Sequence, residues 1–110
     1  MILFKPEHVP MILNHTKTQT RRKGKRRWKV GSVHQAKTNF KKDSAFANLR
    51  ILAVREEPLG CITTEDAKAE GYNSIAEYQQ VYKRIYGTWE PEEEVHVVDF
   101  ELEKALEVQK

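Results

Sequence analysis

The chain has 110 residues and a formal net charge of +3; 39% of its residues are hydrophobic and 32% are charged. This length suits one domain, and this composition is too apolar for a disordered chain and too charged for a membrane protein. Cys61 is the single cysteine, which excludes an internal disulfide and a cysteine-based zinc site, and the four histidines show no metal-ligand spacing, so we expect neither a metal nor a cofactor.

The N-terminal residues predict a short strand followed by a short helix. Met1–Phe4 is interpreted as a buried strand, and Pro6 suits the first turn of a helix whose apolar face carries Val9 and Ile12. Pro10 is compatible only with a helix that starts late or spans one or two turns. Because the chain reaches Pro6 without a long apolar run, we predict no signal peptide and a cytoplasmic protein.

Residues 14–22 form a polar segment that ends in two arginines. If this segment is extended, its side chains alternate between two faces. One face carries Lys17, Gln19 and Arg21, and the other carries Thr16, Thr18, Thr20 and Arg22. Hydroxyl groups on a strand that leads into arginines suit the binding of a polar anionic ligand better than the filling of a core.

Residues 23–29 are predicted to form a loop within the most basic part of the chain. Residues 1–42 carry twelve Lys or Arg and one acid, giving +11, whereas residues 43–110 carry seven Lys or Arg and fifteen acids, giving −8. Such a basic block is typical of nucleic-acid or phosphate binding. The alternative is that the acidic half folds over the basic half and neutralises it, but surface ion pairs contribute little and do not require this segregation.

The basic loop supplies candidate contacts to phosphate groups. Five cations within seven residues repel one another unless a polyanion is near, which favours phosphate contact over a solvated loop. Trp28 either stacks on a base or packs into the core, with the core slightly favoured. The candidate ligand-binding residues of this region are Arg21, Arg22, Lys23, Lys25, Arg26, Arg27 and Trp28.

Two further strands are predicted after the turn at Gly31. One spans Ser32–Lys37, and residues 39–44 then form a polar loop. A longer run, Phe46–Glu56, is predicted to be a central strand that is mostly buried on both faces, and it ends at the Pro58–Gly60 segment.

Two helices are predicted next, and their starts are the clearest local signals in the chain. Thr63 resembles an N-cap before an acidic first turn, and Ser74-x-x-Glu77 is predicted to be a capping box. Gly71 is placed to end the first helix, and Gly87 the second. The second helix carries a stripe at helical spacing that we interpret as core rather than as a base-stacking surface: Ile75, Tyr78, Tyr82 and Ile85.

Residues 95–102 are predicted to be a closing strand, and residues 103–110 a frayed tail. Strands outnumber helices, and no regular alternation of strand and helix, repeat or linker divides the chain. We therefore predict one mixed α+β domain over residues 1–110, built as a small barrel or strongly bent mixed sheet with flanking helices. We favour a monomer that does not associate with membranes.

This order of elements and motifs resembles the ASCH domain family, which is related to the PUA-like barrels of RNA-modifying enzymes. The family pattern G-x-K-x-x-x-x-R is matched by Lys17 and Arg22 within the sequence KTQTRR. His15 stands at the glycine position of the pattern, where glycine would permit a positive φ, and we interpret it as a surface substitution with mild strain. Three later stretches are also typical of small stand-alone members: residues 65–72, 86–89 and 95–101.

The resemblance implies a barrel with a cleft that binds RNA or a nucleotide-like ligand. One wall of the cleft is expected to be the Lys17–Arg22 segment, and the other the helix that carries Glu70. In some small bacterial members that this chain resembles, a lysine, a threonine and a glutamate act as an amidohydrolase on N4-acetylcytidine. Lys17, Thr20 and Glu70 match those three positions.

The residue types permit this hydrolysis without requiring it. Thr20 could supply a nucleophilic hydroxyl, and Lys17 could act as a base if burial or neighbouring cations lowered its pKa, with Glu70 orienting the amine. Alternatively, Lys17 and Glu70 form a fixed ion pair, and Thr20 is an ordinary strand residue. A neutral nucleoside does not need so many cations, so we favour an RNA- or nucleotide-binding domain over an enzyme, and a module that docks on an acidic protein is the weakest alternative.

Overall fold

The computed structural model describes residues 1–106, and within this range five strands form one mixed sheet in the order β1-β3-β4-β5-β2. β1 pairs with β3 in parallel, and the other neighbouring strands are antiparallel. The strands are β1 (Ile2–Leu3), β2 (Gln19–Arg22), β3 (Val33–Lys37), β4 (Ala45–Pro58) and β5 (Glu94–Ala105). The structure therefore confirms a single mixed α+β domain whose sheet curls into a half-barrel.

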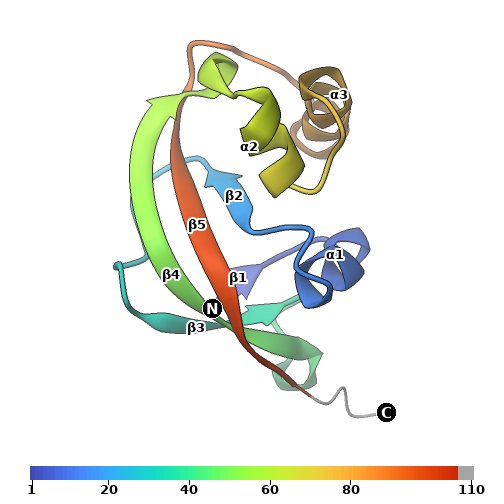
Figure 1. Cartoon of the computed structure of the whole chain (residues 1–110), viewed down its shortest axis with the longest axis vertical. Coiled ribbons are helices and arrows are strands. Elements are labelled where there is room, and N and C mark those ends of the chain that lie inside the picture. Colours follow the sequence, from blue (N-terminus) through green and yellow to red (C-terminus); the bar gives the residue numbers. More distant parts are fainter. Residues whose placement is uncertain (107–110) are drawn as a thin grey trace.

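The two long strands β4 and β5 form the spine of this sheet. Their pairing register shifts between Asn48 and Leu49 and again between Ile51 and Ala53. Bulges of this kind increase the local twist and bend of a strand. In Figure 1, β4 and β5 curve along one side of the molecule, and the helices lie on the opposite, concave side.

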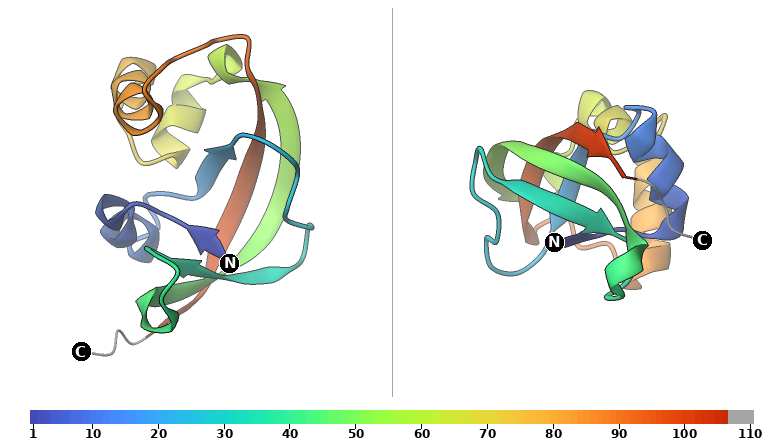
Figure 2. Two further views of the ribbon diagram at one scale, coloured as in Figure 1. Left: turned by 180° about the vertical axis from the view of Figure 1, so that it is seen from behind. Right: turned by 90° about the horizontal axis from the view of Figure 1, so that it is seen from below.

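Short helical segments connect the strands. Figure 2 shows from behind that α2 and α3 lie together at one end of the curved sheet, with α1 lower on the same side. Within the described residues, the α-helices are α1 (Val9–Leu13), α2 (Thr64–Ala69) and α3 (Ile75–Tyr86), and the 3-10 turns are Pro6–His8, Lys42–Ser44 and Leu59–Cys61.

Pro10 is accommodated because its helix begins late. Pro6–His8 forms a 3-10 turn, and α1 begins only at Val9. Pro10 therefore falls in the first turn of α1, where a backbone N–H has no partner within the helix. The late, short helix that the sequence predicts is confirmed.

Polar side chains fix the starts of α2 and α3. Thr63 Oγ1 accepts a hydrogen bond from the Asp66 N–H at 3.1 Å, and the Asp66 carboxylate accepts one from the Thr63 N–H at 3.3 Å, which completes a capping box. Ser74 Oγ accepts from the Glu77 N–H at 3.1 Å, which is one half of the box predicted there. Gly71 follows α2 with φ +104°, and a Cβ at this position would lie 2.8 Å from a methionine sulfur of α1.

The core consists of two clusters that meet along β5. Val98 and Phe100 of β5 belong to the first cluster, whereas Val95 and Val97 belong to the second. The other buried members of the first cluster are Ile2, Phe4, Ile12, Trp28, Ala36, Phe46, Ala47, Leu49 and Ile51. The other buried members of the second are Leu59, Ile62, Ala67, Tyr72, Tyr78 and Tyr82. β5 thus joins the half-barrel to the helical end of the molecule.

Two strand predictions need correction. The polar segment 14–22 is a strand only from Gln19, because the Thr16 and Lys17 N–H groups both donate to the Met11 carbonyl at 2.9 Å and so tie the chain to α1. β4 is not buried on both faces along its whole length. Leu52 is 48% exposed and Ala53 is exposed as well, because β3 pairs with β4 only as far as Arg50 and the rest of β4 pairs with β5 alone.

The predicted frayed tail also begins too early. β5 continues through Ala105, which pairs with Ala47 of β4, so residues 103–105 belong to the sheet. The Leu106 N–H donates to the Phe46 carbonyl at 2.9 Å. The rest of the predicted tail, residues 107–110, lies outside the described residues.

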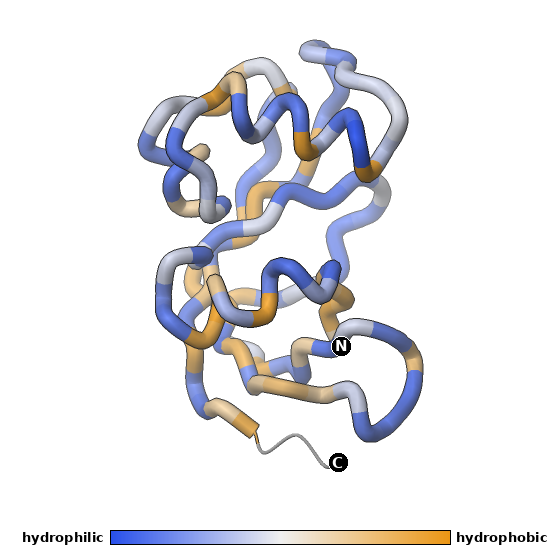
Figure 3. The backbone as a smooth tube through the Cα atoms, turned by 90° about the vertical axis from the view of Figure 1, so that its right-hand side faces the viewer, coloured by the Kyte–Doolittle hydropathy of each residue, from blue (hydrophilic) through white to orange (hydrophobic). Residues whose placement is uncertain are grey.

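No helix within residues 1–106 is long and apolar enough to cross a membrane. The longest, α3, has 12 residues, whereas a spanning helix needs about 20. Figure 3 shows hydrophobic and hydrophilic residues interspersed along the chain rather than gathered in one long segment.

Candidate functional site

A pocket of about 80 Å³ lies where β2 faces the start of the chain and α3. It brings together Lys17, Thr20, Arg22 and Glu70, four residues that the sequence assigns to one cleft. These residues come from segments almost fifty positions apart, and β2 and the end of α2 position them. The remaining lining residues are Phe4, Lys5, His8, Arg21, Tyr72, Tyr78, Val81, Tyr82, Ile85 and Tyr86.

Lys17 and Glu70 form a buried ion pair at the base of this pocket. Lys17 Nζ lies 2.6 Å from Glu70 Oε1, and the two side chains are 2% and 3% exposed. The ammonium also donates to the carbonyls of Gln19 at 3.0 Å and Glu70 at 3.1 Å, so each of its three N–H groups has an acceptor. Burial lowers the pKa of Lys17, and the Glu70 carboxylate opposes that shift.

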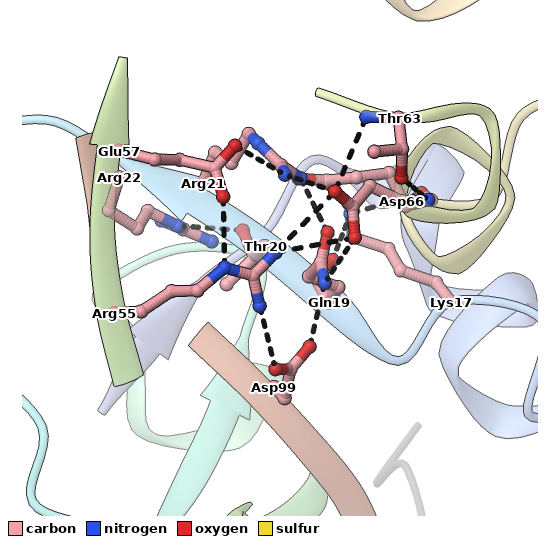
Figure 4. Close-up of polar contacts among 11 residues, drawn as sticks. Lys17, Gln19, Thr20, Arg21, Arg22, Arg55, Glu57, Thr63, Asp66 and Asp99 are labelled. Atoms are coloured by element: carbon pink, nitrogen blue, oxygen red, sulfur yellow. Dashed lines mark hydrogen bonds and ion pairs between the residues drawn. The ribbon is translucent and has the colours of Figure 1, made fainter. Parts of the chain in front are cut away.

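The Arg21 side chain lies within a group of acids that includes Glu70. Its guanidinium has no exposed surface and lies 3.2 Å from Asp66, 3.4 Å from Glu70 and 3.8 Å from Glu57. Figure 4 shows Arg55 converging on the same group of carboxylates. These contacts make Arg21 a counter-ion for buried acids, and its guanidinium is not displayed at the surface.

Thr20 and Arg22 share the face of β2 opposite to Arg21, as the alternation of the strand predicts. Arg22 Nε donates to Thr20 Oγ1 at 3.0 Å, and one Arg22 terminal nitrogen donates to the Leu3 carbonyl at 2.6 Å. The guanidinium carbon also lies 5.0 Å from the centre of the Phe4 ring. Arg22 therefore anchors β2 to β1 and places a positive charge beside the Thr20 hydroxyl.

Tyrosines form the opposite wall, and here the interpretation of the stripe as core is incomplete. Tyr78 and Tyr82 are buried in the second core cluster, as predicted, but they also line the pocket. Tyr86, one turn further along α3, is 44% exposed and lines it as well. Helical spacing could have signalled this wall, since residues four apart share a face.

The Tyr82 hydroxyl is a buried group without a hydrogen-bond partner among the described residues. The residue is only 3% exposed, and burial raises the pKa of its hydroxyl while the neighbouring Lys23 ammonium opposes the shift, so it remains a protonated donor at neutral pH. Buried polar groups are nearly always hydrogen-bonded, and an unsatisfied one in a pocket calls for a partner. Its position in the pocket lining makes a ligand atom a suitable partner.

His8 is a further pocket residue that the sequence did not reveal. His8 Nε2 lies 2.8 Å from the Tyr72 hydroxyl, a contact between residues 64 positions apart. Burial lowers the pKa of His8 to about 4; the nearby Lys17 adds to the shift, and Glu7 opposes it. His8 is therefore neutral at pH 7.

We expect His8 to make the folded protein sensitive to acid. The pKa of His8 is lower in the folded than in the unfolded chain, so the unfolded state binds more protons between about pH 6.5 and pH 4, and stability falls as pH falls through this window. The loss should be about 1–2 kcal/mol, after allowance for partial solvent access. Chemical unfolding at several pH values measures it, and His8→Gln should show a flatter profile; identical profiles would contradict the assignment.

The basic loop divides into neutralised and unpaired cations. Lys23 Nζ lies 3.0 Å from Glu93, and Gly24 is held by a 2.6 Å hydrogen bond between its carbonyl and His96 Nε2. Within residues 1–106, four loop cations have no carboxylate within 4.0 Å: Lys25, Arg26, Arg27 and Lys29. The acidic half thus neutralises Lys17, Arg21 and Lys23 but leaves the loop positively charged.

The structure shows where the side chains of Trp28 and His15 lie. The Trp28 ring is buried in the first core cluster, and Trp28 also lines a second hollow beside the pocket. His15 has φ +67°, the conformation that the glycine of the family pattern would supply, and its side chain is exposed and absent from the pocket lining. His15 is thus a strained surface residue.

Solved structures of other proteins share this fold. An ASCH domain from Lactobacillus crispatus superposes with a TM-score of 0.68 at 14% identity, covering 86% of this chain and 69% of that one. The Enterococcus faecalis protein EF3133 gives 0.70 at 17% identity, covering 90% and 68%. ASCH from Zymomonas mobilis gives 0.64 at 14% identity, covering 96% and 70%. No family model matches the sequence, and no curated protein is significantly similar to it.

The curled sheet with helices on its concave side is a mixed α+β half-barrel. More specifically, the chain has the fold of ASCH domain proteins over most of its length. The TM-scores of 0.64–0.70 establish the shared fold, and at identities of 14–17% the ligand and any reaction have to be argued from the residues of this chain.

Proposed function

We propose that this protein binds single-stranded RNA and holds one nucleobase in the pocket between β2 and α3. The observation that carries the proposal is the composition of the pocket. A tyrosine wall faces hydrogen-bonding groups on β2, and the unpaired cations of the basic loop follow directly in the chain. Aromatic rings stack on bases, and a positively charged surface tracks the phosphate backbone, which is the usual combination for single-stranded nucleic acid.

The dimensions of the pocket limit what it holds. Its volume of about 80 Å³ is below the roughly 300–1,000 Å³ of pockets that enclose whole drug-sized ligands. A single planar base suits such a space, with the sugar and phosphate outside. Thr20 and Arg22 line the pocket beside the buried Lys17–Glu70 pair, and hydrogen bonds from such groups to a base edge are stronger where water is largely excluded.

Tyr82→Phe tests the pocket without disturbing the fold. Removing an unsatisfied buried hydroxyl should leave stability unchanged or raise it by up to about 1 kcal/mol. If the hydroxyl donates to a bound base, affinity for a mixed-sequence single-stranded RNA should fall about 5–10-fold, the worth of one hydrogen bond. Calorimetric titration and thermal unfolding measure the two effects. Unchanged affinity would show that the hydroxyl does not meet the ligand.

A second candidate function is amide hydrolysis on an N4-acylated cytosine nucleoside. The observation that favours it is that Lys17, Thr20 and Glu70 line one pocket, with burial lowering the pKa of Lys17. Arg22 Nε donates to Thr20 Oγ1 at 3.0 Å and would stabilise negative charge on a nucleophilic oxygen. Against it, all three donors of the Lys17 ammonium are occupied, which suits a fixed ion pair better than a free base.

Release of acetate from N4-acetylcytidine distinguishes the two candidates. If binding is the function, purified protein releases no acetate beyond the uncatalysed rate. If hydrolysis is the function, turnover occurs and Thr20→Val, which keeps the shape of the side chain but removes its hydroxyl, abolishes it. Turnover that survives Thr20→Val would point to a contaminating enzyme or to a different nucleophile.

A further inference from the structure

A second hollow adjoins the pocket. It has a volume of about 300 Å³ and shares two lining residues, Arg22 and Tyr86, with the pocket. Its other lining residues are Met1, Leu3, Lys23, Lys25, Arg27, Trp28 and Phe40. The two cavities are thus neighbours along one continuous surface, and the basic loop forms one side of the hollow.

The chemistry of this hollow selects an anion with a flat apolar part. Its described lining contains four cations and five apolar or aromatic side chains, and no carboxylate. Lys25 and Arg27 have no acidic partner within 4.0 Å among residues 1–106, so their charges are free to meet a ligand. Phosphate groups meet the first requirement, and nucleobases the second.

Phe40 lines this hollow but not the pocket, so base binding in the pocket does not account for its exposed ring. Its side chain is 77% exposed, which is unusual for a large aromatic residue, and Lys41 and Lys42 follow it directly. The loop that carries it is held by local hydrogen bonds. The Lys41 N–H donates to Asn39 Oδ1 at 2.8 Å, and Ser44 Oγ donates to the Asn39 carbonyl at 2.9 Å. Phe40 is thus a solvent-facing ring in an ordered turn rather than in a chain end.

We propose that the hollow is the subsite for the nucleotide adjacent to the one in the pocket, with Phe40 stacking on its base and Lys25 and Arg27 contacting its phosphate. This inference rests on the proposed function, since Arg22 and Tyr86 belong to both cavities. It goes beyond that function because it makes the ligand at least a dinucleotide and assigns a role to Phe40. The protein thus contacts two neighbouring bases of a single strand.

The test compares ligands of increasing length by calorimetric titration. A ribonucleoside 5′-monophosphate, a dinucleotide and a tetranucleotide are titrated at the same salt concentration. The dinucleotide should bind about tenfold tighter than the mononucleotide, because a base that stacks on an aromatic ring adds affinity. Phe40→Ala should abolish this gain and leave mononucleotide affinity unchanged, whereas Phe40→Trp should keep it.

Leu52→Ala is the matched control, because Leu52 is another exposed apolar residue, at 48%, and it lines neither cavity. It should alter neither affinity, and thermal unfolding confirms that each variant folds. A full dinucleotide gain in Phe40→Ala overturns the second subsite while leaving the pocket intact. Failure of all three ligands to bind the unaltered protein overturns the proposed function itself. Displacement of the tetranucleotide by polyglutamate of equal charge, at equal concentration, overturns stacking in favour of plain anion binding.

Discussion

Glu70→Ala is expected to lower the free energy of unfolding by about 3–5 kcal/mol, enough to unfold much of a marginally stable domain. Glu70 Oε1 lies 2.6 Å from Lys17 Nζ and Glu70 Oε2 lies 3.4 Å from Arg21, and all three side chains are at least 97% buried. Removing the carboxylate leaves an ammonium in the core without its counter-charge. Urea unfolding followed by circular dichroism measures the loss.

A double-mutant cycle shows whether the loss comes from this pair. Lys17→Met should also be destabilising, because it leaves the Glu70 carboxylate without its nearest cation. Lys17→Met combined with Glu70→Leu should be more stable than either single variant, since apolar replacement of a buried pair removes both charges together. Glu92→Ala, at an exposed glutamate without an ion pair among the described residues, should change stability by no more than about 0.5 kcal/mol. A loss of under about 1 kcal/mol in Glu70→Ala would contradict the buried ion pair.

Reversing two charges of the basic loop is expected to weaken RNA binding by at least about 100-fold at low salt. Lys25→Glu with Arg27→Glu removes two phosphate contacts and adds repulsion from two carboxylates. Both residues line the hollow and have no acidic partner within residues 1–106, so their replacement should leave stability nearly unchanged. Titration with a fluorescent single-stranded RNA measures the affinity.

The control for this experiment carries the same change in net charge elsewhere. Lys68 on α2 and Lys104 on β5 are exposed and line neither the pocket nor the hollow. Lys68→Glu with Lys104→Glu should weaken binding only slightly, because neither lysine lines a cavity where a phosphate of the ligand is expected to bind. Equal losses in the two double variants would mean that overall charge, and not the loop, drives binding.

The elements of this fold were predictable where a local signal marks them. Thr63 and Ser74 begin helices because their side chains satisfy free backbone N–H groups, and Gly71 ends one because it tolerates a positive φ. The exposed second half of β4 was not predictable. Its alternation of residue types does not reveal which strands and helices cover it, and the bulges that bend it depend on β5.

Site residues were predictable from the alternation of side chains along a strand and from the resemblance to ASCH domains. Alternation along β2 correctly placed Arg21 and Thr20 on opposite faces of the strand. The acids that form ion pairs with Arg21 lie more than thirty residues away in the sequence, so no local pattern indicated them. The pairing of Lys17 with Glu70 came from the resemblance to ASCH domains, since no local rule joins residues 53 positions apart. Helical spacing places Tyr86 one turn after Tyr82, whereas no pattern in the polar loop around Phe40 indicates that its ring lies beside the basic loop.

The salt dependence of RNA binding tests the central claim most directly. The affinity of the unaltered protein for a mixed-sequence single-stranded RNA should be measured between about 50 and 200 mM salt. A basic loop that contacts three or four phosphates predicts that the logarithm of the binding constant falls linearly with the logarithm of salt concentration, with a slope of about −2 to −3. No binding at 50 mM salt, or equal binding at both ends of the range, would contradict the account.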